Sequence, residues 1–158
     1  MRIDKNDLLL YAVTDRQWLG EASLAEQLEE AIQAGVTVVQ LREKELDFDA
    51  FVSLGKELQA VAKRHRIPFI INDAVDVALA LGADGVHVGQ SDMQAGDVRS
   101  RIGEGKILGV SAHSVEEALA AERNGADYLG VGAIYGTATK PDANTLSIET
   151  LQQICQAV

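Results

Sequence analysis

The sequence has a single cysteine, few basic residues and no long apolar run. Cys155 is the only cysteine among 158 residues, which excludes an intrachain disulfide and a cysteine metal cluster. Its place in the amphipathic stretch Ile148 to Val158 favours a half-buried helix residue over a nucleophile. Apolar runs such as Leu8 to Val13 are far shorter than the ~20 residues that cross a bilayer. Met1 to Asp7 lacks the basic flank of a signal peptide, so we expect a cytoplasmic protein with no membrane partner.

Acidic residues outnumber basic ones. The 24 Asp and Glu against 14 Lys and Arg give a formal net charge of −10 at pH 7. A surface of this charge repels polyanions, so nucleic acid is not expected as a partner. Any site for an anion must therefore be formed locally. The hydrophobic fraction of 47% is ordinary for a globular domain.

Short apolar runs alternate with longer amphipathic stretches, which is typical of βα units around a parallel sheet. The strands are predicted at Leu8–Val13, Val36–Leu41, Pro68–Ile71, Gly85–Val88, Ile107–Val110 and Tyr128–Val131. The helices are predicted at Ser23–Ala34, Phe48–His65, Val75–Leu81, Ala95–Arg101, Val115–Asn124 and Ile148–Ala157. Ser23 with Glu26, and Ser114 with Glu117, have the spacing of capping boxes.

Six such units fit two architectures: an open doubly wound sheet, or an eight-unit (β/α) barrel without its last two units. Periodicity does not decide between them. The turn after the first strand reads Thr14-Asp15-Arg16 and has no glycine, which disfavours a dinucleotide-binding sheet. No composition break divides the chain, so residues 1–158 are expected to form one domain.

Polar residues follow the predicted strands directly, at the edge where parallel α/β folds place their active sites. The second strand runs into a segment in which Gln40, Arg42 and Lys44 occupy alternate positions, and they are expected to project from one side of it. This arrangement suits an anion, and a set of surface ion pairs is the alternative. Asp73 and Asp92 follow the third and fourth strands. The two carboxylates suit Mg²⁺ when a phosphate completes its coordination, although each alone could be a helix N-cap.

Two later strands are also followed by polar residues. Ser111 lacks a Gly-x-Ser-x-Gly elbow, so we predict that it donates a hydrogen bond to phosphate and is not a nucleophile. His113 is predicted to pack or to cap a helix. The loop after the sixth strand contains Thr137, Thr139 and Lys140 among small residues. This composition predicts a phosphate-binding loop that closes over a ligand, with an ordinary surface turn as the alternative.

Five short motifs occur in a fixed order along the chain. They read Gln-Leu-Arg-Glu-Lys from Gln40, Asn-Asp-x-x-Asp-Val-Ala from Asn72, His-Val-Gly-Gln-x-Asp from His87, Gly-x-Ser-x-His from Gly109 and Gly-Thr-x-Thr-Lys from Gly136. In this order and spacing the chain resembles the thiamine-phosphate synthase family, from about Leu10 to Asp142. The resemblance implies an α/β fold of the parallel (β/α) TIM-type barrel.

The resemblance also implies a reaction between two small molecules. Hydroxymethylpyrimidine diphosphate loses pyrophosphate, and the nitrogen of a thiazole phosphate captures the resulting cation. By this resemblance Asp73 and Asp92 would hold Mg²⁺, and Gln40 and His87 would line the pyrimidine pocket. The diphosphate would be bound by Arg42, Lys44, Asn72, Ser111 and Lys140, of which Arg42, Ser111 and Lys140 would be catalytic. Thr137 and Thr139 would contact the thiazole phosphate.

The chain stops at Val158, whereas members of that family continue through two further βα units. We therefore expect a barrel of six of its eight units that is either incomplete as given or paired with a second copy in a homo-oligomer. The thiazole tautomerase of the same fold is the nearest alternative enzyme, but it lacks aspartates at the positions of Asp73 and Asp92. A remnant that binds phosphate ligands without turnover is the alternative from a different class.

Overall fold

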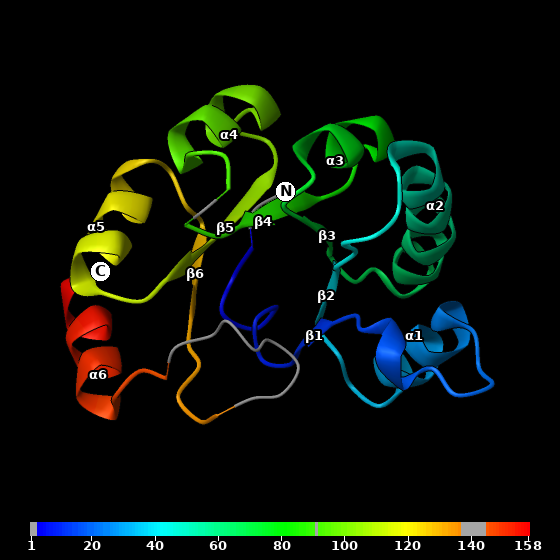
Figure 1. Ribbon diagram of the computed structural model, residues 1–158, viewed down its shortest axis with the longest axis horizontal. Coiled ribbons are helices and arrows are strands. Elements are labelled where there is room, and N and C mark those ends of the chain that lie inside the picture. Colours follow the sequence, from blue (N-terminus) through cyan, green and yellow to red (C-terminus); the bar gives the residue numbers. More distant parts are fainter. Residues whose placement is uncertain (1–2, 91, 137–144) are drawn as a thin grey trace. The chain divides into compact units, whose positions relative to one another are not determined.

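The computed structural model describes residues 3–90, 92–136 and 145–158, in which strands and helices alternate along the chain (Figure 1). The strands are β1 (Tyr11–Val13), β2 (Val38–Leu41), β3 (Phe69–Asn72), β4 (Gly85–Val88), β5 (Ile107–Ala112) and β6 (Tyr128–Val131). The helices are α1 (Leu24–Gln33), α2 (Phe48–His65), α3 (Val75–Leu81), α4 (Ala95–Ile102), α5 (Val115–Arg123) and α6 (Ile148–Ala157), with a 3-10 helix η1 at Arg16–Trp18.

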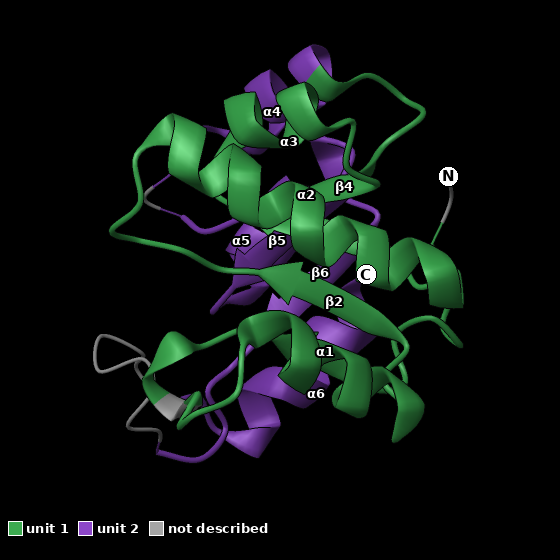
Figure 2. Cartoon of the chain, turned by 90° about the vertical axis from the view of Figure 1, so that its right-hand side faces the viewer, with its two compact units in different colours: residues 1–87, 102–107 green, residues 88–101, 108–158 purple. Residues whose placement is uncertain are grey.

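The chain forms two compact units, which are coloured separately in Figure 2. The first unit comprises residues 1–87 and 102–107, and the second comprises residues 88–101 and 108–158. The first unit therefore contains β1, β2, β3 and nearly all of β4. The second contains β5 from its second residue, together with β6, α5 and α6.

In the first unit, consecutive strands pair in parallel. Tyr11 lies opposite Val38, Gln40 opposite Ile70, and Asn72 opposite His87. Helix α1 packs against α2, and α2 packs against α3. The fully buried side chains of this unit include Val38, Val39, Leu41, Leu58, Phe69, Ile70 and Ile71. Burial of each of the larger ones contributes about 2 kcal/mol, so these strands have little freedom to change register.

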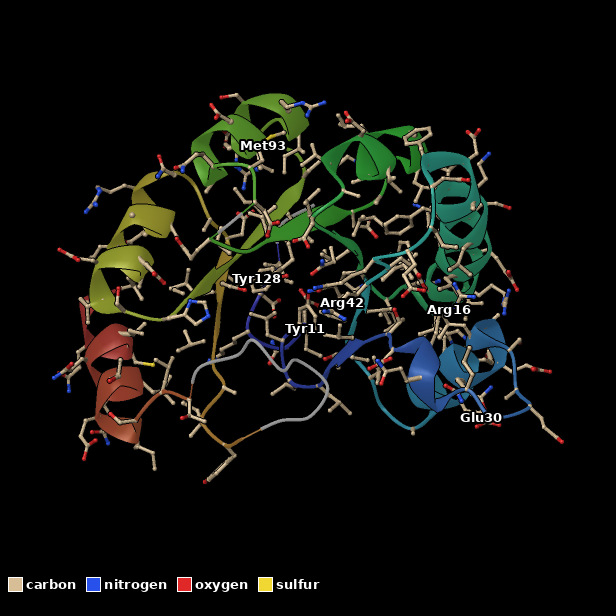
Figure 3. The ribbon with its side chains drawn as sticks, viewed as in Figure 1. Tyr11, Arg16, Glu30, Arg42, Met93 and Tyr128 are labelled. Carbon is tan, nitrogen blue, oxygen red and sulfur yellow. The ribbon has the colours of Figure 1, made fainter. Side chains whose placement is uncertain are left out.

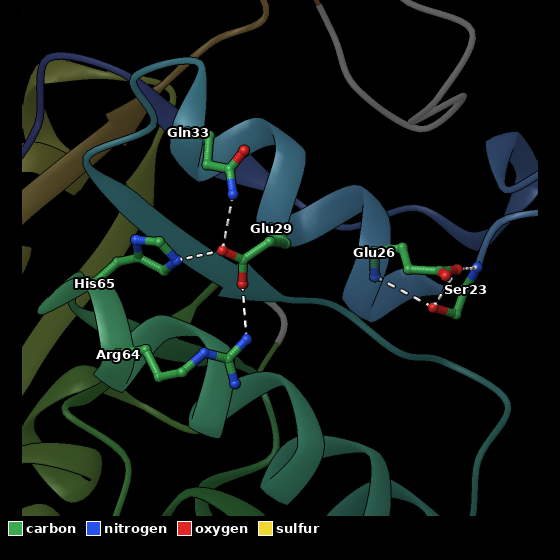
Figure 4. A network of polar contacts seen from close by, with 6 residues as sticks. All are labelled: Ser23, Glu26, Glu29, Gln33, Arg64 and His65. Carbon is green, nitrogen blue, oxygen red and sulfur yellow. Dashed lines mark hydrogen bonds and ion pairs between the residues drawn. The ribbon is translucent and has the colours of Figure 1, made fainter.

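A polar network also ties α1 to α2 in the first unit (Figure 4). The Glu29 carboxylate accepts from Arg64 at 2.7 Å and from Gln33 at 3.1 Å, and it lies 2.5 Å from Nε2 of His65. Hydrogen bonds from Arg64 and then from His65 lower the pKa of Glu29 from 4.5 to about 2. The carboxylate is thus kept ionised at the surface where the two helices meet.

In the second unit, β5 and β6 pair in parallel, and α5 packs against α6. A small core joins Ala112 of β5, Ala118 of α5 and Ile154 of α6. Asp127, just before β6, accepts from the backbone N–H of Leu108 at 2.7 Å and from Arg99 at 2.6 Å. These contacts fix the start of β5 and of β6.

The element boundaries agree closely with the sequence predictions. Five elements have the bounds expected: α2, α3, β4, β6 and α6. The first strand is shorter than expected, because the Thr37 hydroxyl, in place of a ladder partner, accepts from the backbone N–H of Leu10. Val36 is not part of β2, because its N–H still donates to Ala31 in the turn that ends α1. β5 runs two residues further than expected, since Ser111 and Ala112 pair with Gly130 and Val131.

One of the two predicted capping boxes is complete. Ser23 and Glu26 exchange both hydrogen bonds at the start of α1 (Figure 4). Ser114 accepts from the N–H of Glu117 as expected. The Glu117 carboxylate, however, accepts from the backbone N–H of His113 at 2.6 Å, so the reciprocal half of this box was wrong.

The predicted half-burial of Cys155 was also wrong. Its side chain lies on α6 as expected but is exposed, while the neighbouring Ile154 is buried. None of the helices in the described part of the chain is long and apolar enough to cross a bilayer.

Candidate active site

Gln40 of β2 and Arg42, which follows β2, are held by Tyr11 of β1 and by Thr14, which follows β1. Gln40 is only 5% exposed, and its Nε2 donates to the hydroxyl of Tyr11 at 2.9 Å. The Thr14 hydroxyl accepts from the N–H of Arg42 at 3.0 Å, and the N–H of Thr14 donates to the carbonyl of Gln40 at 3.0 Å. Figure 3 labels Tyr11 and Arg42 in the first unit. The backbone that carries two predicted ligand-binding residues is therefore fixed by direct contacts.

Lys44 lies beyond the strand. β2 ends at Leu41, and Lys44 is exposed in a bend that follows it. Between Arg42 and Lys44, the Glu43 side chain is 5% exposed and lies 3.5 Å from Arg16. Oε1 of Glu43 is buried without a hydrogen-bond partner among the described residues. This segment thus contains one buried carboxylate, that of Glu43, between the basic residues Arg42 and Lys44.

Asn72, Asp73 and His87 come together at the adjoining ends of β3 and β4. Asn72 and His87 are register partners, and Nδ2 of Asn72 donates to Oδ2 of Asp73 at 2.5 Å. The N–H of Asp73 donates to the carbonyl of His87 at 2.9 Å. Asp73 also has a φ of 58°, in the left-handed region that non-glycine residues seldom adopt. Residues in this costly conformation cluster at functional sites, where contacts with the surrounding structure hold them in place.

Asp92 and Ser111 belong to the second unit. Oδ2 of Asp92 accepts from the N–H of Gly89 at 2.8 Å, and Gln90 donates to the carbonyl of Ser111 at 2.6 Å. A small cavity of about 60 Å³, bordered by Asp92, Gly89 and Glu117 among others, lies beside this turn. It has room for water molecules next to the carboxylate.

His113 has the structural role predicted for it. Its backbone N–H and its ring Nδ1 both meet the Glu117 carboxylate, at 2.6 Å and 3.2 Å. Asp84 is likewise structural, since it accepts from the N–H of Phe69 at 2.9 Å. Thr137, Thr139 and Lys140 lie outside the described residues.

Sequence reasoning missed Tyr11, Thr14 and Gly89 as supports of the predicted site. Each acts through a neighbour, since Tyr11 contacts Gln40, Thr14 contacts Arg42, and Gly89 contacts Asp92. The polar side chain of Thr14, directly after β1, would have been a signal, whereas Tyr11 lies at the start of β1 and carried none. Gly89 carried no such signal, because its contribution is a backbone N–H and the absence of a Cβ.

The donor atoms at the predicted metal positions are of the type that Mg²⁺ prefers. Asp73 and Asp92 supply carboxylate oxygens, and Mg²⁺ binds to one or two carboxylates together with water and substrate phosphate. Only one oxygen of Asp92 is used by the Gly89 N–H hydrogen bond. The residue types therefore fit the ion.

The comparisons with known proteins identify the family. A family model described as thiamine monophosphate synthase matches residues 10–158. The chain belongs to this family. It is 55% identical over 152 residues to the thiamine-phosphate synthase of Clostridium acetobutylicum, an alignment that covers 96% of the chain and 72% of that enzyme. To the thiamine-phosphate synthase of Clostridium tetani it is 53% identical, with 96% and 73% covered.

A solved structure of a thiamine monophosphate synthase relative supports the fold. The thiamine phosphate pyrophosphorylase of Pyrococcus furiosus matches with a TM-score of 0.86 at 38% identity, and the match covers 97% of this chain and 72% of that one. The predicted fold class, a parallel (β/α) TIM-type barrel, is therefore confirmed. The predictions of an enzyme and of a transferase are confirmed by the same matches.

Proposed function

We propose that this chain transfers a pyrimidinylmethyl group from hydroxymethylpyrimidine diphosphate to the ring nitrogen of a thiazole phosphate, releasing pyrophosphate and forming thiamine phosphate. The observation that carries the proposal is the set of Asn72, Asp73 and His87 at the adjoining ends of β3 and β4, with Asp73 in a left-handed conformation. Family membership supports the same reaction. The proposed setting is the cytoplasm, and the proposed partners are these small molecules.

The chemistry required of the residues is charge stabilisation. When the C–O bond to the diphosphate breaks, negative charge gathers on the departing pyrophosphate. Fixed positive charges and N–H or O–H donors stabilise that charge more than they stabilise the substrate. Lys44 and Asn72 would bind the diphosphate, and Arg42, Ser111 and Lys140 would bind it and assist its departure.

The remaining roles are divided between metal and ring binding. Asp73 and Asp92 would hold Mg²⁺, which supplies further positive charge to the diphosphate when bound. Gln40 and His87, which are 5% and 9% exposed, would line the pyrimidine pocket. Thr137 and Thr139 would contact the thiazole phosphate. No general base is needed, because the attacking ring nitrogen carries no proton to remove.

The test is a turnover assay with the purified chain, both substrates and Mg²⁺. We expect thiamine phosphate and pyrophosphate in equal amounts, with product formation abolished in Asp73→Asn. Glu30→Gln is the matched control and should leave turnover unchanged, because it removes one exposed carboxylate of α1 to which no role in the site is assigned.

Three other results would contradict the proposal. Magnesium-dependent binding without turnover would indicate the non-catalytic remnant. Isomerisation of a thiazole substrate alone would indicate the tautomerase, although the quoted relatives are synthases. Absence of binding of both the pyrimidine diphosphate and the thiazole substrate would exclude the synthase, the tautomerase and the non-catalytic remnant.

Light scattering on the same sample would test whether the chain pairs with a second copy.

A further inference from the structure

The carboxylate of Glu43 is buried, and one of its oxygens has no partner. The side chain is 5% exposed, and Oε1 makes no hydrogen bond to any of the described residues. Oε2 lies 3.5 Å from Nη1 of Arg16, which is longer than the distance of about 2.8 Å in an ordinary charge-assisted hydrogen bond. A buried charge with so little compensation is unfavourable, so the protein gains stability in a state that pairs both oxygens.

Arg16 is placed to pair both oxygens. It is the first residue of η1, and its side chain is half exposed. It borders a cavity of about 440 Å³ that residues of α1 and α2 also line, so the side chain has room to move. A guanidinium presents two parallel N–H groups that match the two oxygens of a carboxylate. A small shift of Arg16 would therefore pair Oε1 as well as Oε2 of Glu43.

Glu43 lies between the two cations of the proposed diphosphate site. Arg42 and Lys44 flank it in the sequence, and the backbone of Arg42 is already held by Thr14. Lys44 is exposed in the bend that follows β2. Because Glu43 and Lys44 share one planar peptide unit, a contact that fixes Glu43 also restricts the backbone of Lys44.

We infer that Arg16 is a positioning residue, which closes on Glu43 as a bidentate pair and thereby holds Lys44 for the diphosphate. The inference rests on the proposed function, in which Arg42 and Lys44 bind the diphosphate. Arg16 and Glu43 act through Lys44 without touching the ligand. Charge alone has the opposite effect, since a carboxylate beside two cations weakens their attraction for a polyanion.

The experiment measures the affinity for pyrophosphate by calorimetry in the presence of Mg²⁺. Wild type is compared with Glu43→Gln, Arg16→Gln and Arg16→Lys. We expect about 10-fold weaker binding in each variant, the value of one charge-assisted hydrogen bond. Arg16→Lys belongs with the other two because lysine keeps the charge but lacks the fork that contacts both oxygens.

Two further variants test the pairing itself. The double variant of Arg16→Gln and Glu43→Gln should bind pyrophosphate no more weakly than either single variant, because the two residues act as one pair. Arg123→Gln removes an exposed guanidinium on α5 and is the matched control, so its affinity should equal that of wild type.

A separate measurement distinguishes positioning from a loss of folded protein. In steady state, KM for the pyrimidine diphosphate should rise in each single variant of the pair while KM for the thiazole phosphate stays unchanged. Partial unfolding lowers the amount of active enzyme and does not change one KM alone. Arg16→Lys keeps the inference testable if Glu43→Gln folds poorly, because the Arg16 side chain is half exposed.

Three results would overturn the inference. Tighter pyrophosphate binding by Glu43→Gln would show that only its charge matters. Wild-type affinity in Arg16→Lys would exclude the bidentate pair, and additive losses in the double variant would show that the two residues act independently. Failure of the proposed function is distinguishable, because in that case the wild type itself would not bind pyrophosphate, and the inference would fail with it.

Discussion

The side-chain hydroxyl of Thr14 bridges the backbone of Arg42. Oγ1 accepts from the N–H of Arg42 at 3.0 Å and lies 3.5 Å from its carbonyl oxygen, to which it donates. Thr14 follows β1 and Arg42 follows β2, so this side chain continues the strand pairing beyond the last backbone bond between them. The strand end that carries Gln40 and Arg42 is thereby kept extended.

Thr14→Val should remove this bridge without changing the shape of the side chain. We expect a loss of about 1 kcal/mol in the free energy of unfolding, because a partly buried N–H loses its acceptor. The affinity for pyrophosphate should fall as well, since Arg42 is no longer held. Thr14→Ser retains the hydroxyl and should behave as wild type in urea unfolding and in pyrophosphate titration. Wild-type behaviour of Thr14→Val together with a defect in Thr14→Ser would show that the methyl group, and not the hydroxyl, matters.

Asp73 should be strained in the free protein. Its φ of 58° costs a residue with a Cβ roughly 1 kcal/mol, and glycine avoids this cost. Asp73→Gly and Asp73→Ala both lose the carboxylate, so both should lose Mg²⁺-dependent ligand binding. In chemical denaturation the glycine variant should be about 1 kcal/mol more stable than the alanine variant. Equal stability would mean that the left-handed backbone is not strained.

Glu29 should make stability depend on pH in the acid range. Its folded pKa of about 2 lies below the ordinary 4.5, so its stabilising effect is complete above pH 4.5 and is lost as the pH falls toward 2. Glu29→Gln should therefore be less stable than wild type at pH 6, and the difference should shrink as the pH approaches 2. Urea unfolding at several pH values measures this.

The effect of Glu29 should be modest, because solvent screens a surface ion pair. Glu30→Gln is the matched control, since it removes a carboxylate from the same helix without touching Arg64 or His65. A stability difference between Glu29→Gln and wild type that stays constant from pH 6 to pH 2 would contradict the assignment.

Gly89 should be needed for the position of Asp92. A Cβ at residue 89 would lie 2.8 Å from Oδ2 of Asp92, so Gly89→Ala must displace the carboxylate. The atom displaced is the end of a side chain, so the fold should survive. Mg²⁺ affinity should fall roughly 10-fold, as for other residues that orient a metal ligand. Gly105→Ala, where an added Cβ meets nothing within 4 Å, should leave the affinity unchanged. Normal Mg²⁺ affinity in Gly89→Ala would contradict this role.

The sequence predicted elements best where local signals and burial agree. α2 has Asp47 as its N-cap and a regular apolar face, and both of its ends were predicted correctly. β1 was predicted too long because Leu9 and Leu10 read as strand residues, whereas their side chains are 75% and 50% exposed. The apolar run did not reveal that the Thr37 side chain occupies the position of the next ladder partner.

The site was predictable only in part for a similar reason. Position at or after a strand end indicated Gln40, Asn72 and Asp73, and the family resemblance added His87; the structure places these residues at the ends of β2, β3 and β4. Their supporting contacts cross from one strand to the next. The Tyr11–Gln40 bond joins residues 29 positions apart, and such a pair has no local sequence signal.

We propose that Asp73 and Asp92 hold one divalent ion that allows basic strand ends to bind a diphosphate. Electron paramagnetic resonance of Mn²⁺, used in place of Mg²⁺, measures this directly in the wild type, Asp73→Asn and Asp92→Asn, each with and without the pyrimidine diphosphate. We predict one tightly bound Mn²⁺ per wild-type chain when the ligand is present, and loss of that ion in either variant. Retention of the ion in both variants would contradict the account.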